Sequence, residues 1–107
     1  MPTADAVLVL TTLPISADSA AFGRALVDRR LAACVSVLPP MESTYRWKGA
    51  VEHNAERQLI IKTGAPAVNA LMAAIREIHP YEVPEILVVP VTGGDPQYLQ
   101  WLADATA

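Results

Sequence analysis

Four short hydrophobic stretches mark the chain, and each is bounded by proline, glycine or polar residues. Short apolar runs with such boundaries are typical of β-strands in a sheet. Between the first and second stretches, and again between the third and fourth, hydrophobic residues recur at helical spacing, which predicts an amphipathic helix in each interval. The predicted strands cover residues 7–10, 33–38, 58–63 and 86–91.

The two predicted helices have recognisable ends. Ser16 is expected to cap the first helix, and Arg29 and Arg30 lie at its end, where cations suit the helix dipole. In the second helix Pro66 stands near the first position, and Pro80 ends the helix. The apolar stripe of this second helix is the most regular in the chain and comprises Val68, Leu71, Met72, Ile75 and Ile78.

A long hairpin is predicted between the helices. Pro39-Pro40 must bend the second strand or place it at an edge. The strand pattern resumes at residues 43–48, and Gly49-Ala50 is expected to begin a turn that leads back into the third strand. Alternation along the outgoing strand separates aromatic from basic side chains, with Tyr45 and Trp47 on one face and Arg46 and Lys48 on the other.

The predicted order is βαββαβ, followed by a short C-terminal helix that begins at Asp95-Pro96. This order is typical of an α+β, ferredoxin-like sandwich with both long helices on one face of an antiparallel sheet. We expect a single domain over residues 1–107. Three of the strands are apolar on both faces, so we also expect subunits to pack sheet against sheet or to pair along the hairpin.

Composition narrows the classes of function. Hydrophobic residues make up 52% of the chain and charged residues 18%, which suits a folded core rather than a disordered segment. The net charge of −3 gives no overall basic surface for nucleic acid or for a membrane. No apolar run is long enough to span a bilayer, and residues 1–6 lack the basic start of a signal peptide, so a cytoplasmic protein is expected.

The segment from His79 to Glu85 concentrates the chemistry of the chain. Pro80 and Pro84 make the segment rigid. The imidazole of His79 is a general ligand for Cu(II), Ni(II) and Zn(II), and among these ions Cu(II) binds such nitrogen donors most tightly. Glu82 and Glu85 add oxygen donors. The alternative is that His79 ends the helix and its ring hydrogen-bonds a carbonyl or a glutamate. A helix C-terminus would also favour the protonated imidazole, which does not bind metal.

Other chemistry-bearing residues have simpler interpretations. Cys34 lies among apolar strand residues and is expected to pack. Glu52, His53 and Glu56 are expected to form a solvated region near the hairpin tip. No phosphate-binding glycine loop, catalytic triad or close acid pair indicates an enzyme. The aromatic residues of the hairpin are interpreted as interface anchors rather than base-stacking residues.

Five motifs occur in this chain, at residues 31–35, 45–49, 60–63, 79–85 and 98–102. Together they resemble the CutA family of divalent-cation tolerance proteins. The resemblance extends from about Val7 to Leu102. It implies a ferredoxin-like fold, trimers in which long hairpins pair between subunits, an architecture like that of the PII signalling proteins, and tolerance of divalent metals, above all copper.

The family's proposed copper ligands are matched here only in part. The resemblance implies a cysteine near the end of the first strand, where this chain has Thr11. It also implies two adjacent histidines before the Pro-Tyr pair, where this chain has Ile78 and His79. The resemblance therefore supports the fold more fully than the metal site.

Three hypotheses follow. The first is a non-enzymatic homotrimer for divalent-metal homeostasis, which needs no cofactor and binds copper or a similar ion weakly between subunits. His79 would be the principal ligand, supported by Glu82 or Glu85, and His79→Ala would abolish specific copper binding. The interface of this trimer would include Tyr45, Trp47 and Trp101. The second hypothesis is a PII-like signalling or scaffold trimer that binds a small organic anion or a partner protein, with possible anion contacts at Arg24, Arg29, Arg46 and Lys62. The third is that stability itself is the main selected property and the metal site is incidental.

Overall fold

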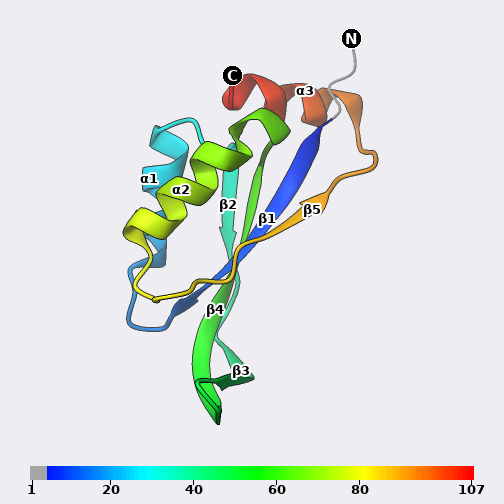
Figure 1. Cartoon of the computed structure of the whole chain (residues 1–107). Helices are drawn as coiled ribbons and strands as arrows, with labels where there is room; N and C mark the ends of the chain where they lie inside the picture. Colours follow the sequence, from blue (N-terminus) through cyan, green and yellow to red (C-terminus); the bar gives the residue numbers. More distant parts are fainter. Residues whose placement is uncertain (1–4) are drawn as a thin grey trace.

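An antiparallel sheet of five strands carries two helices on one face and a third helix across one end (Figure 1). The computed structural model describes residues 5–107; residues 1–4, which belong to the expected domain and to the stretch judged not to be a signal peptide, lie outside the described residues. A 3-10 turn, η1 (Ala65–Ala67), precedes the second helix. The other elements are β1 (Ala6–Pro14), α1 (Ser19–Asp28), β2 (Cys34–Val37), β3 (Met41–Trp47), β4 (Ala50–Gly64), α2 (Val68–Ile78), β5 (Leu87–Pro90) and α3 (Pro96–Ala105).

The strand order confirms the ferredoxin-like prediction. The sheet runs β2-β4-β1-β5, and β3 pairs with the far end of β4. Every pairing is antiparallel. Pro39-Pro40 interrupts the second predicted strand as expected, and both resulting strands pair with β4 because that strand is 15 residues long. β1 extends to Pro14, well beyond the apolar stretch that predicted it, because its polar end pairs with β4 as far as Glu56.

The core lies between the sheet and helices α1 and α2. Alternate residues of β1 and β4 face the helices, and Val9 and Ile61, which are partners in the ladder, are both fully buried. The helices contribute Leu26 and Ile75 to the same core. The predicted N-cap of α1 was wrong, because Asp18 rather than Ser16 accepts a hydrogen bond from the backbone N–H of Ala21.

The hairpin of β3 and β4 extends beyond the helix-covered sheet and gives the molecule a long axis of 49 Å. Its two-residue loop is Lys48-Gly49, one residue earlier than predicted. Both residues have positive φ, 49° and 81°, as a type I′ turn requires. This turn matches the right-handed twist of the strands, so the hairpin stays paired to its tip.

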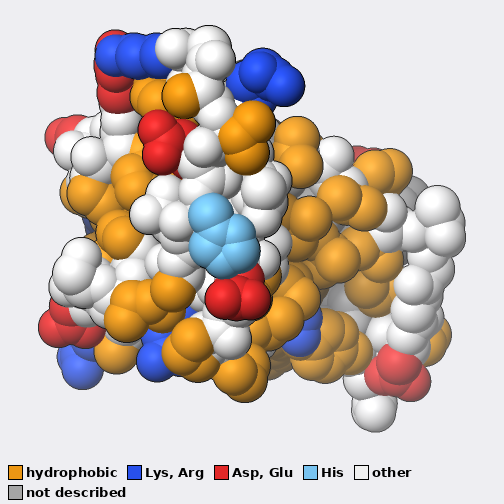
Figure 2. Space-filling view, turned by 90° about the horizontal axis from the view of Figure 1, so that it is seen from below, with side chains coloured by type: hydrophobic (Ala, Val, Ile, Leu, Met, Phe, Trp, Pro, Cys, Tyr) orange, Lys and Arg blue, Asp and Glu red, His pale blue; other side chains and the backbone are white. Residues whose placement is uncertain are grey.

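The face of the sheet opposite α1 and α2 is only partly covered. α3 crosses the end near Gly64, where the Thr106 side chain lies close to that glycine. β5 remains exposed, and Leu87 retains 55% of its accessible surface. Hydrophobic side chains gather on the side of the molecule where β5 runs (Figure 2). Within residues 5–107, no helix has the length and apolar character needed to cross a membrane.

Candidate functional site

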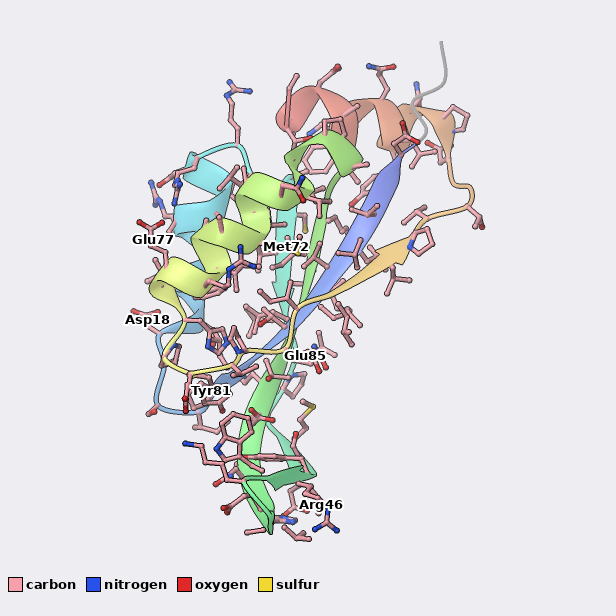
Figure 3. All side chains as sticks on the ribbon, in the orientation of Figure 1. Asp18, Arg46, Met72, Glu77, Tyr81 and Glu85 are labelled. Carbon is pink, nitrogen blue, oxygen red and sulfur yellow. The ribbon has the colours of Figure 1, made fainter. Side chains whose placement is uncertain are left out.

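The segment of residues 79–85 leads from the end of α2 to the start of β5 and passes the base of the hairpin. Figure 3 shows Tyr81 and Glu85 on this segment, with Arg46 on the hairpin. The backbone turns from helical to extended at His79, where φ is −76° and ψ is 136°. This extended conformation is what a following proline demands, so Pro80 explains where α2 ends.

His79 is buried and uses both ring nitrogens within the chain. Its Nε2 lies 2.6 Å from the carbonyl oxygen of Thr12, and the backbone N–H of Tyr81 donates to its Nδ1 at 3.0 Å. A ring that accepts at Nδ1 and faces a carbonyl at Nε2 must carry its proton on Nε2. The imidazole is therefore neutral, and its hydrogen bond to Thr12 connects the segment to β1.

The charge state of His79 follows from this burial. Desolvation lowers the pKa of the imidazole below its ordinary value of 6.5, although the Thr12 carbonyl and the Glu56 carboxylate oppose this shift. The helix-end argument, which favoured the protonated ring, is outweighed because the side chain turns into the protein. The alternative interpretation, a helix-ending histidine bonded to a carbonyl, is confirmed by this geometry.

Tyr81 and Glu56 form a partly buried polar pair beside the segment. The Tyr81 hydroxyl donates to Oε2 of Glu56 at 2.6 Å. Glu56 is only 5% exposed. Burial and the hydrogen bond to Glu56 raise the pKa of the Tyr81 phenol far above its ordinary value, so the phenol remains a donor.

Two further carboxylates lie on the segment itself. Oε2 of Glu85 accepts a hydrogen bond at 3.0 Å from the amide of Gln58, which also donates to the Thr11 carbonyl. Glu82 lies 3.3 Å from Nζ of Lys48, and both side chains are more than two-thirds exposed. The ion pair is therefore screened by solvent, whereas Glu85 is held by a neutral partner.

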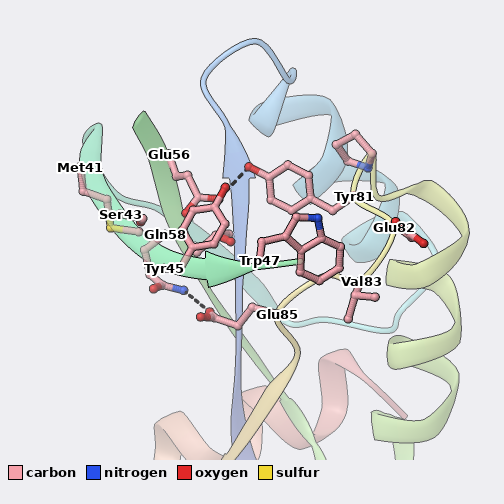
Figure 4. A pocket seen from close by; sticks show the side chains of 12 residues that line it. Met41, Ser43, Tyr45, Trp47, Glu56, Gln58, Tyr81, Glu82, Val83 and Glu85 are labelled. Carbon is pink, nitrogen blue, oxygen red and sulfur yellow. Dashed lines mark hydrogen bonds between the residues drawn. The ribbon is translucent and has the colours of Figure 1, made fainter. Parts of the chain in front are cut away.

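A cleft of about 580 Å³ opens between this segment and one face of the hairpin (Figure 4). The segment contributes residues 80–83 and Glu85, and β4 contributes Glu56 and Gln58. The same face of β3 supplies the opposite wall, Met41, Ser43, Tyr45 and Trp47. The cleft thus combines aromatic walls with three carboxylates.

The residues expected to bind metal do not form a complete metal centre in one chain. Within residues 5–107, no three His, Cys, Asp or Glu side chains are grouped closely enough to hold an ion. Both nitrogens of His79 are occupied, and Thr11, at the family's cysteine position, is fully buried. Only Glu82 and Glu85 remain as donors that line the open cleft.

The structure separates the expected interface residues. Tyr45 and Trp47 line the cleft and are 39% and 38% exposed. Trp101 lies on α3, packs against Tyr98 with ring centroids 5.4 Å apart, and is 47% exposed. The three side chains therefore occupy opposite ends of one chain.

The four cations considered for anion binding are also dispersed. Arg24 and Arg29 lie on the α1 side of the molecule, in ion pairs with Asp28 and Glu77. Arg46 is at the hairpin tip (Figure 3), and Lys62 lies on the opposite face of the sheet from α1, over the Tyr98 ring. They do not converge on one anion site.

The sequence did not predict Glu56 and Gln58 as cleft residues. Glu56 was assigned to a solvated region near the hairpin tip, and this was wrong because it pairs with Pro14 and Met41 at the hairpin base. Strand alternation places Glu56 and Gln58 on one face. The segment that covers this face comes from 25 or more positions later in the chain, so alternation alone gave no signal of burial.

The strand order, the helices on one face and the hairpin cleft define a ferredoxin-like α+β protein. The sequence profile described as CutA1 divalent ion tolerance protein matches residues 7–105, and the chain belongs to this family. It is 44% identical over 101 residues to the divalent-cation tolerance protein CutA of Pectobacterium atrosepticum, covering 94% of this chain and 92% of that protein. The crystal structure of CutA from Xylella fastidiosa has a TM-score of 0.92 and 43% identity, covering 96% and 99% of the two chains.

Relatives in plants are longer. Protein CutA, chloroplastic, of Arabidopsis thaliana is 36% identical over 104 residues, which is 97% of this chain but 57% of that protein. Its name also places it in the chloroplast, so family membership alone does not assign a compartment.

Proposed function

We propose that this protein contributes to divalent-metal tolerance as a cytoplasmic, non-enzymatic homotrimer, and that it holds copper or a similar ion weakly between its subunits. The single observation that supports this most is membership of the CutA1 divalent ion tolerance family over nearly the whole chain. The relatives are named for tolerance rather than for a reaction. The chain would act by binding, without a resident cofactor.

The exposed apolar surface supports the assembly. Leu87, Val88 and Val89 of β5 are 55%, 43% and 39% exposed, and these neighbours form a continuous apolar strand. A second copy that covered this strand would remove the patch from water, at roughly 25 cal/mol for each Å² of apolar surface buried. Tyr45 and Trp47 on the hairpin and Trp101 on α3 are exposed at opposite ends of one chain and would contact other copies in the trimer.

The incomplete donor set supports a site between copies rather than inside one. Glu82 and Glu85 offer carboxylate oxygens at the cleft, and donors from a second subunit would complete the coordination. His79 would position the segment from behind through its bonds to Thr12 and Tyr81. Such a site would bind Cu(II) more weakly than a site with several imidazoles.

Calorimetric titration with Cu(II) tests the metal proposal. The Glu82→Gln/Glu85→Gln variant should lose saturable binding, whereas Glu42→Gln/Glu52→Gln, which neutralises two exposed hairpin carboxylates, should retain it. His79→Ala should weaken binding less than the first variant if His79 only positions the segment. Complete loss in His79→Ala alone, with Glu82 and Glu85 dispensable, would return His79 to the role of principal ligand. Equal binding by all four proteins would contradict a specific site.

A further inference from the structure

The cleft beside residues 80–85 has the size and the walls of a small-molecule site. Its volume of about 580 Å³ falls within the range of roughly 300–1,000 Å³ found for ligand pockets. Met41 and Val83 supply apolar surface, and Tyr45 and Trp47 supply aromatic surface. A metal ion held at Glu82 and Glu85 would use none of these walls, so the apolar and aromatic part of the cleft suits an organic group.

The charge of the cleft favours a cation. Among the residues that line the cleft, Glu56, Glu82 and Glu85 are acidic, and none is Lys, Arg or His. Lys48 reaches Glu82 from the hairpin tip. Within residues 5–107, neither Glu56 nor Glu85 makes an ion pair. An anion would be repelled here, and a cation would be attracted.

Glu56 is the carboxylate of the cleft that most favours a bound cation. Glu56 as a residue is only 5% exposed, and the hydrogen bond to its carboxylate comes from the neutral Tyr81 hydroxyl. A buried carboxylate without a cationic partner is costly, because one neutral donor does not replace the water that the charge has lost. A cation placed in the cleft next to Glu56 would offset that cost.

The aromatic side chains favour an ammonium group among cations. Tyr45, Trp47 and Tyr81 all line the cleft, and the faces of such rings attract ammonium groups. The structure already contains one example, since Nζ of Lys48 lies 5.6 Å from the centroid of the Trp47 ring. The cleft can therefore hold a positive nitrogen and the carbon chain attached to it.

We propose that this cleft binds an alkylammonium group, with its N–H groups directed to Glu56 and its aliphatic part against the hairpin aromatics. This goes beyond metal tolerance and does not depend on it. The ammonium group has two possible sources, a free small amine or a lysine side chain of a second copy of this chain. Both use the same chemistry at Glu56.

The test uses ¹⁵N-labelled full-length protein in EDTA, so that divalent metal does not contribute. n-Butylammonium chloride is titrated while the indole N–H signals of Trp47 and Trp101 are followed by NMR, with n-butanol and butyrate as uncharged and anionic probes. A saturable shift of the Trp47 signal is expected only with the amine, and Trp101, on α3, serves as the internal reference.

Glu56→Gln should weaken binding at least about tenfold, because it removes the charge that pairs with the ammonium. Glu52→Gln, which neutralises an exposed carboxylate on the same face of the same strand, should bind like the parent.

Glu56→Gln keeps an acceptor for the Tyr81 hydroxyl, and circular dichroism checks that it folds. If it does not, Glu85→Gln serves as the second variant, with weakened binding expected. The Trp47 signal could fail to shift with the amine while the folded Glu56→Gln or Glu85→Gln variant has a lower assembly mass than the parent. This result would assign the ammonium to a lysine of a neighbouring copy and support the proposal. No response together with unchanged mass, or equal binding by parent and variant, would overturn it. Because metal is absent throughout, failure here leaves the copper proposal untouched.

Discussion

At the residue scale, two buried threonines on the helix-facing side of the sheet differ in one hydrogen bond. Thr11 and Thr63 are both fully buried. The Thr63 hydroxyl donates to the Leu31 carbonyl at 2.8 Å, whereas within residues 5–107 the Thr11 hydroxyl has no partner. A polar group without a partner carries its desolvation cost with no compensation.

Thr11→Val should therefore raise the free energy of unfolding by about 1 kcal/mol, because it replaces an unpaired hydroxyl with a methyl group of similar size. Thr63→Val is the matched control and should lower stability by about 1 kcal/mol or more, because it leaves the Leu31 carbonyl without its donor. Urea denaturation of both variants measures the difference. Destabilisation of equal size in both would show that the Thr11 hydroxyl has a partner after all.

The burial of His79 should make the free energy of unfolding depend on pH. Burial lowers the pKa of the folded imidazole below 6.5, so near and below that pH the unfolded chain binds more protons than the folded chain. Stability should therefore fall as pH is lowered from 8 through 6.5 toward the depressed pKa of the folded state. His79→Gln should flatten this part of the profile, while His53→Gln, which alters the exposed histidine of the hairpin, should keep it. Unfolding experiments across this range would reject the assignment if the two variants behaved alike.

At the element scale, the hairpin depends on its turn. Gly49→Ala should destabilise the protein by about 1 kcal/mol, because a side chain at φ 81° is strained even where space is open. Gly93→Ala is the matched control, since nothing lies within 4 Å of its added Cβ and its φ is not in the strained region. It should be neutral or slightly stabilising. Equal thermal shifts in the two variants would contradict the turn geometry.

The helices and most strands could be predicted from local sequence patterns, whereas the cleft could not. Periodicity identified both long helices, and Pro39-Pro40 marked the break between β2 and β3. The bonds that build the cleft join distant residues: His79 reaches Thr12 across 67 positions, and Tyr81 reaches Glu56 across 25. Alternation within β4 fixes the face of Glu56 but not what covers that face. Local patterns thus gave the scaffold, and only the three-dimensional structure shows the burial that distinguishes Glu56 from other acids.

At the scale of the whole molecule, a single chain exposes apolar, aromatic and acidic surfaces that a partner could cover. β5 exposes a continuous apolar strand, and three carboxylates line the cleft. Trp101 on α3 and Trp47 on the hairpin are exposed aromatic residues that one chain cannot bring together. Surfaces of this kind are typical of proteins that assemble. The metal proposal depends on the same assembly, because residues 5–107 of a single chain bring together no three side chains that could hold an ion.

Native mass spectrometry with and without Cu(II) tests assembly and metal binding in one measurement. Without metal, the expected mass is that of three chains. With Cu(II), a defined number of copper ions should add to the parent trimer and none of these should add to the Glu82→Gln/Glu85→Gln trimer. A monomer at micromolar concentration would contradict the assembly. A trimer that carries the same copper in the parent and in the variant would contradict the site.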